Sequence, residues 1–82
     1  MKDDAVHLQH ILECVARIEQ YTSAGHGEFM ASTLIQDGVI RNLQTIGQSV
    51  LKLSEAFKSA HSEVDWKSII GLRNVLVHDY LG

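Results

Sequence analysis

An arginine, a histidine and a tyrosine lie within eight residues near the end of the sequence, at Arg73, His78 and Tyr80. Arginine presents a planar fork of N–H donors that matches the oxygens of a phosphate. Histidine titrates near neutral pH and can act as a general base or acid. The pair could cleave RNA without a metal: the 2'-hydroxyl would attack, the histidine would move its proton, and the arginine would stabilise the phosphorane charge. Asn74 could add a hydrogen bond, and Tyr80 could position a phosphate or base.

Helical geometry separates these side chains. On a continuous α-helix, Arg73 and Tyr80 lie on nearly the same face, whereas His78 lies roughly 140° round from Arg73. Arg73 and His78 would converge if the chain unwound near Val77, or if two chains met and built a composite site at a two-fold axis. The alternative is an ordinary helix end whose polar groups only pair with one another. The spacing alone favours that alternative.

The composition describes a small helical protein. Its 82 residues make one domain, near the size at which a single core is only marginally sufficient. The net charge of -3 excludes a broad basic surface, and we expect no DNA partner. The lone cysteine, Cys14, cannot form an internal disulfide, which favours the cytoplasm. No apolar run approaches the ~20 residues of a membrane span, and the start is too polar for a secretory signal.

The first predicted helix begins at Asp3 or Asp4, either of which can cap it, and ends near Tyr21. Residues 23–27, Ser-Ala-Gly-His-Gly, are a breaker cluster that we interpret as a loop. It is not a phosphate loop, because no Lys-Ser/Thr follows the glycines. The apolar residues of this helix recur every three or four positions and form one stripe: Ala5, Leu8, Ile11, Leu12, Val15 and Ile18.

A longer helix is predicted from about Ala31 to about Ser59. Its seam has spacings of 4, 4, 3, 4, 3 and 4 residues: Ile35, Val39, Leu43, Ile46, Val50, Leu53 and Phe57. Gly47 beside the seam permits close approach of another helix. So long a helix with so wide a stripe needs more than one neighbour, which a second chain would supply.

A third helix is predicted from Trp66, capped by Asp65. We expect the larger apolar residues of this helix to face inward: Trp66, Ile69, Ile70, Leu72 and Leu76. No alternating run supports a strand. The expected fold is therefore all-α, an antiparallel bundle of about three helices completed by homodimerisation.

Other candidate residues have simpler interpretations. His7 and His10 could ligate a metal, but no third ligand has suitable spacing, so an exposed pair is favoured and no metal site is predicted. Cys14 is read as a small core residue. Asp37, Arg41 and Gln44 flank the seam as polar interface contacts, with phosphate binding by Arg41 as the alternative.

The segment at residues 66–80 resembles the signature of HepT-like toxins of the HEPN superfamily. That signature is a Trp, a short apolar stretch and Gly-Leu-Arg-Asn, with four residues between this Arg and a His, and one residue between the His and a Tyr. Residues 43–49, Leu-Gln-Thr-Ile-Gly-Gln-Ser, resemble the family block Leu-Glu-x-Ile-Gly-Glu-Ala. Residues 18–22, Ile-Glu-Gln-Tyr-Thr, resemble its Ile-x-x-Tyr-Thr. The resemblance covers nearly the whole chain in the same order.

The resemblance implies an all-helical homodimer that is a metal-independent endoribonuclease and needs no cofactor. It implies a toxin, with RNA as substrate, paired with an ATP-using nucleotidyltransferase antitoxin. Arg73 and His78 would be catalytic, and Tyr80 would be the tyrosine that the partner adenylylates. An anionic nucleotide beside Arg73 would block the RNA site.

The chain also departs from the family pattern. Gln44 and Gln48 stand at two acidic positions, and Val64 and Asp65 stand where a proline often precedes the tryptophan. The chain stops two residues after Tyr80, where family members usually continue, so we expect one domain over residues 1–82 that lacks the family's C-terminal helix. The alternative function is a non-catalytic helical dimer that docks the nucleotidyltransferase or is modified by it. The low positive charge and the missing helix favour it.

Overall fold

A computed structural model describes the backbone of residues 2–80 and the side chains of residues 3–78. The described residues form helices joined by short connections, with no strand among them, so the predicted all-α class is confirmed. Its five α-helices are followed by one π-helical turn: α1 (Lys2–Tyr21), α2 (His26–Ala31), α3 (Thr33–Lys52), α4 (Glu55–Ala60), α5 (Trp66–Val75) and η1 (Leu76–Tyr80). None of the helices within residues 2–80 is long and apolar enough to cross a membrane.

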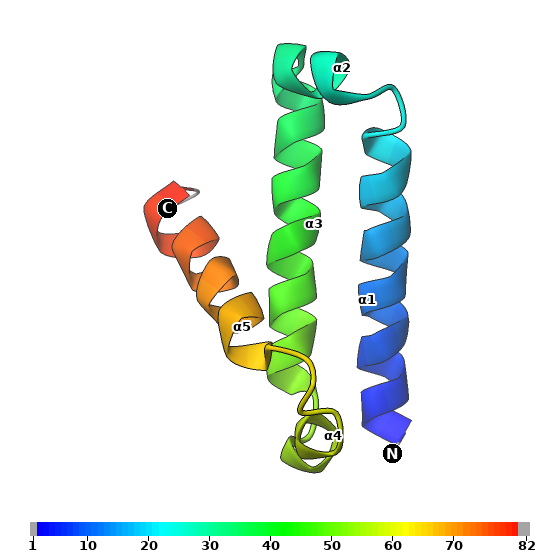
Figure 1. The fold of residues 1–82 in the computed structure, drawn as a ribbon, viewed down its shortest axis with the longest axis vertical. Helices are drawn as coiled ribbons and strands as arrows, with labels where there is room; N and C mark the ends of the chain where they lie inside the picture. The colour runs from blue at the N-terminus through cyan, green and yellow to red at the C-terminus, as the bar shows by residue number, and fades with distance from the viewer. Residues whose placement is uncertain (1, 81–82) are drawn as a thin grey trace.

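Helix α3 lies between α1 and α5 and runs antiparallel to both (Figure 1). The short helices α2 and α4 form the two corners, and α5 leans away from α3 toward its C-terminal end. Both outer helices pack mainly against α3 rather than against each other. The three longest helices correspond to the three that were predicted, but within one chain they form an open layer and not a closed bundle.

Helix α1 ends at Tyr21, as predicted, and Gly25 has a positive φ of 97° that lets the chain turn into α2. The predicted loop at residues 25–27 is only partly right, because α2 begins at His26. The predicted apolar stripe of α1 is also partly wrong. Leu12 is 63% exposed and Val15 is 40% exposed, whereas Cys14 is buried.

The predicted helix from Ala31 to Ser59 is wrong, because α3 ends at Lys52 and α4 begins at Glu55. Between them, the backbone of Leu53 is extended and its side chain is buried. The apolar seam alone could not show this break, since its period continues across it.

A contact between two residues that are fifty positions apart in the sequence explains the break. The carboxylate of Asp4 accepts hydrogen bonds from the backbone N–H of Ser54 (2.8 Å) and from its hydroxyl (2.7 Å). The Ser54 hydroxyl oxygen in turn accepts from the N–H of Phe57 and caps α4. The backbone hydrogen bond and then the side-chain hydrogen bond from Ser54 hold the pKa of Asp4 below its ordinary value. Asp4, predicted as a possible cap for its own helix, therefore fixes the start of another.

Helix α5 begins as predicted. Asp65 accepts hydrogen bonds from the hydroxyl and the N–H of Ser68, and these bonds lower the pKa of Asp65. Leu76 is buried, but Leu72, predicted to face inward, is 47% exposed. The apolar side chains with the least exposure form a small core around α3: Cys14, Val39, Val50, Leu53 and Leu76.

Candidate functional site

The site is built on a close approach of α5 to α3 at Gly47. A Cβ atom added at Gly47 would lie 2.7 Å from Cγ and 3.5 Å from Cα of Arg73, with Cβ of Arg73 closer still. Only a glycine fits here without movement of α5. The aliphatic stem of Arg73 therefore occupies the helix–helix contact, and the side chain is half-buried.

Neutral side chains hold the Arg73 guanidinium. Its Nη2 donates to Oε1 of Gln48 (3.0 Å) and its Nη1 donates to Oδ1 of Asn74 (3.0 Å). The Nε atom is buried without a hydrogen-bond partner. Neither of the two ion pairs found among the described side chains includes Arg73. The guanidinium is thus oriented but keeps an uncompensated positive charge, which suits it to an anionic ligand.

The chain leaves α-helical geometry directly after α5. In η1 the hydrogen-bond pattern widens from i→i+4 to i→i+5, which reduces the rotation between residues five apart. This change occurs around Val77, where unwinding would help Arg73 and His78 to converge. Within this chain, however, no hydrogen bond among the described side chains joins the two, and His78 is exposed. The backbone of Tyr80 lies in η1, but its side chain lies outside the described residues.

The structure thus joins Arg73, Asn74 and Gln48 by hydrogen bonds, and no hydrogen bond among the described side chains joins His78 to them. Asn74, predicted as a supporting residue, lies beside the guanidinium, and its supporting role stays a prediction. Gln48 was not predicted as a contact of Arg73. The sequence feature that could have indicated this contact is Gly47. A glycine that lets another helix approach closely also places the next residue, here Gln48, near that helix.

The remaining candidate residues lie elsewhere. The rings of His7 and His10 have centroids 6.3 Å apart in an edge-on arrangement. No group of three metal-binding side chains is found within the described part of the chain. Cys14 is 1% exposed, which confirms it as a core residue.

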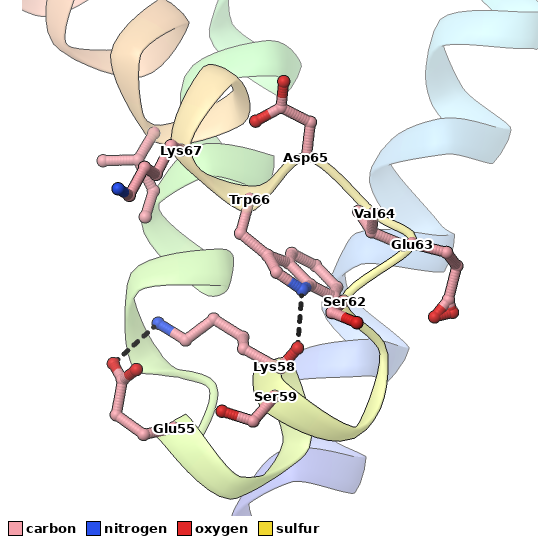
Figure 2. A pocket seen from close by; sticks show the side chains of 10 residues that line it. Glu55, Lys58, Ser59, Ser62, Glu63, Val64, Asp65, Trp66 and Lys67 are labelled. Carbon is pink, nitrogen blue, oxygen red and sulfur yellow. Dashed lines mark hydrogen bonds and ion pairs between the residues drawn. The ribbon is translucent and has the colours of Figure 1, made fainter.

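A hollow of about 640 Å³ lies beside α4 and the start of α5 (Figure 2). Several of its polar groups take part in structural contacts. Lys58 pairs with Glu55 at 3.2 Å, and the indole N–H of Trp66 donates to the carbonyl oxygens of Lys58 and His61, both at 3.1 Å. Trp66 therefore fastens α5 to α4. It lies two helical turns before Arg73, roughly 10 Å along the axis, so this hollow is not the site around Arg73.

Comparison with known proteins adds an independent finding. The family described as "Ribonuclease HepT-like" matches residues 11–82. A protein of Caldanaerobacter subterraneus subsp. tengcongensis named "Putative RNase" is 36% identical over 83 residues, which cover 100% of this chain and 74% of the relative. "Probable ribonuclease HepT" of Thermococcus cleftensis is 31% identical over 77 residues, which cover 93% of this chain and 70% of the relative.

Another relative is much longer than this chain. A Methanocaldococcus jannaschii protein named "Gamma-glutamylcyclotransferase and putative RNase" is 34% identical over 82 residues. The match covers 99% of this chain but only 37% of that relative, so the two share one segment of the longer protein. No solved structure matches the chain significantly.

Proposed function

The chain belongs to the HepT-like ribonuclease family, and on that premise we propose that it is a metal-independent endoribonuclease with Arg73 and His78 as catalytic residues. One observation carries the assignment of these residues. The guanidinium of Arg73 is held in place by two neutral amides with no carboxylate paired to it, five residues before an exposed histidine. A purely structural arginine would be expected to pair with an acid, because leaving a half-buried charge uncompensated is unfavourable.

The proposed reaction uses the substrate's own nucleophile. The imidazole of His78 takes the proton from a ribose 2'-hydroxyl as its oxygen forms a bond to the adjacent phosphorus. The bond from phosphorus to the 5'-oxygen then breaks, and that oxygen takes a proton from a protonated imidazole. The products are a 2',3'-cyclic phosphate and a 5'-hydroxyl. Arg73 stabilises the extra negative charge on the phosphorane oxygens, where a preorganised donor is most effective.

We further propose that two chains pair through the outer face of α5. This face carries small and apolar residues at helical spacing: Ser68, Gly71, Leu72 and Val75. Leu72 and Val75 are 47% and 51% exposed, and there is open space around Gly71. A second chain at this face would cover these exposed apolar side chains around a two-fold axis.

The proposed biological role is that of a cytoplasmic toxin that an ATP-using nucleotidyltransferase antitoxin switches off. In this reaction the phenolic oxygen of Tyr80 attacks the α-phosphorus of ATP, and pyrophosphate leaves. The adenylyl group would sit two residues from His78 and offer its phosphate to Arg73. It would then compete with RNA for the same cation.

Substitution of His78 tests the catalytic assignment. With EDTA present, His78→Ala should lower RNA cleavage by about 10²–10⁴-fold, the usual contribution of a general acid–base group. His10→Ala, which changes an exposed histidine on α1, should cleave normally. In cells, His78→Ala should also abolish growth arrest. Cleavage by His78→Ala at the wild-type rate would favour the alternative function, a non-catalytic dimer that docks the nucleotidyltransferase. The net charge of -3, and the lack of a hydrogen bond between His78 and Arg73 among the described side chains, favour that alternative.

Intact mass tests the regulation. Incubation with the partner enzyme and ATP should add one adenylyl group to the wild-type chain. Tyr80→Phe should abolish the gain, and Tyr21→Phe, which changes the other tyrosine, should preserve it. A mass gain that survives Tyr80→Phe would show that the acceptor lies elsewhere.

A further inference from the structure

A polar hollow of about 230 Å³ lies on α3 beside the Arg73 contact. Four side chains line it: Arg41, Gln44, Thr45 and Gln48. The first and the last of them are seven positions apart, or roughly 10 Å along the helix axis. The core residues of α3, such as Val39 and Val50, are buried against the other helices. Arg41, Thr45 and Gln48 are instead exposed, so a ligand could reach the hollow from solvent.

The lining of this hollow is chemically one-sided. It contains a cation, two amides and a hydroxyl, but no carboxylate. Arg41 takes part in neither of the ion pairs found among the described side chains. The nearest acid along this face of α3 is Asp37, one turn earlier, and it forms no ion pair with Arg41 either. Thr45 donates its hydroxyl hydrogen to the carbonyl oxygen of Arg41 at 3.0 Å, so its contribution is local.

Gln48 joins this hollow to Arg73. Its Oε1 accepts the hydrogen bond from the Arg73 guanidinium, and its amide NH₂ has no partner among the hydrogen bonds of the described residues. The side chains of Arg41, Gln44 and Gln48 therefore offer N–H donors along one line that ends at Arg73. A row of donors on a chain of net charge -3 is suited to an extended anion rather than to a neutral ligand.

We propose that this hollow is a phosphate-binding subsite for an RNA strand, in which Arg41 and Gln44 hold a phosphate near the one that Arg73 engages. The subsite rests on the proposed function, because it names further substrate contacts of the same site. Phosphate contacts supply most of the affinity of proteins for single strands without reading their sequence. The subsite explains how a protein without a broad basic surface holds its substrate.

Binding of an uncleavable strand tests the subsite separately from catalysis. The probe is a fluorescent 2'-O-methyl oligoribonucleotide, which has the phosphates of RNA but no free 2'-hydroxyl, and the readout is anisotropy at several salt concentrations. Arg41→Gln should weaken binding roughly tenfold, the effect of one charge-assisted hydrogen bond. It should also reduce the slope of log affinity against log salt by about 0.7. Arg17→Gln, which removes an equal charge from α1, should change affinity less than about twofold.

A second pair of variants keeps every cation in place. Gln44→Glu adds a carboxylate to the hollow and should weaken probe binding, whereas Gln9→Glu on α1 should not. Equal binding by Arg41→Gln and Arg17→Gln, or no binding of the probe by the wild-type chain, would overturn the subsite. If Arg41→Gln binds as tightly as wild type while wild type cleaves ordinary RNA, the subsite fails and the ribonuclease stands. If Arg41→Gln loses binding but wild type cleaves no RNA, the subsite stands and the ribonuclease fails.

Discussion

The two sides of α3 are built differently, although each contains a glycine at a close helix–helix contact. On the α1 side, Gly38 faces only the ring edge of Tyr21, at 3.2 and 3.3 Å, and the nearby Asn42 is buried with its amide bonded to the carbonyl of Gly38. On the α5 side, Gly47 faces the stem and backbone of Arg73. An apolar residue at position 73 would pack there without a buried charge. A half-buried arginine without an acidic partner is expected to lower stability at this position, which is consistent with the role in chemistry that we propose for it.

Among substitutions that distinguish the α5 side of α3 from its α1 side, Gly47→Ala is expected to have the largest effect on stability and on RNA cleavage. The added methyl group would press on Arg73 and push α5 away, at a cost of about 1–3 kcal/mol in the free energy of unfolding. A displacement of the guanidinium by about 1 Å can lower the rate of cleavage by about 10². Denaturant unfolding and RNA cleavage measure the two effects.

Gly38→Ala is the matched control for that change. Here the added methyl group meets only the edge of the exposed Tyr21 ring, which can shift. Alanine also gains up to about 1 kcal/mol of helix propensity over glycine. We expect little net change in stability and normal cleavage. Equal loss of cleavage in both glycine variants would contradict the distinction between the two sides.

A smaller effect, on stability alone, is expected from Cys14→Ser. The thiol is buried on the helix that packs against the other side of α3. A hydroxyl there would lose its water partners, at a cost of about 1–3 kcal/mol. Cleavage per folded molecule should remain at the wild-type level below the melting transition. A selective loss of cleavage would show that the α1 side also shapes the site.

The smallest effect is a pH dependence of the Asp4–Ser54 contact. Because the pKa of Asp4 is lower in the folded chain, its charge stabilises the fold fully above the ordinary aspartate value of about 3.9. This contribution is lost as the pH falls through the lower folded-state pKa. Asp4→Asn should therefore lower the melting temperature at neutral pH, and the difference from wild type should shrink in acid. Asp3→Asn, at an exposed neighbour, should give no such convergence.

Local patterns predicted the parts of the fold that depend on neighbours in sequence. The end of α1 at Tyr21 follows from the breaker cluster after it, and the start of α5 follows from the Asp65 cap. The break between α3 and α4 could not be predicted in this way. It depends on the hydrogen bond between Asp4 and Ser54, which are fifty residues apart. The periodicity of apolar residues along a helix cannot indicate a contact of this kind. Leu12 and Leu72 were misplaced for a related reason: an apolar residue shows that a face can be covered, but not which neighbour covers it.

The candidate site shows the same division. The types and spacing of Arg73, Asn74 and His78 identified the segment that could carry chemistry. The amide of Gln48 and the hollow around Arg41 lie on another helix, so their proximity to Arg73 depends on how α5 packs at Gly47. Sequence reasoning could find the glycine but not the register of the contact.

The most direct test of the account is the rate of RNA cleavage by Arg73→Ala under single-turnover conditions with EDTA, with circular dichroism as a check on the helices. Arg17→Ala on α1 is the control. We predict that Arg73→Ala keeps its helical content and that its cleavage rate falls about 10²–10³-fold. The cleavage rate of Arg73→Lys, which lacks the planar fork, should also remain well below that of wild type. Cleavage by a folded Arg73→Ala at the rate of wild type and Arg17→Ala would contradict the central claim that the α5 side of α3 carries the chemistry.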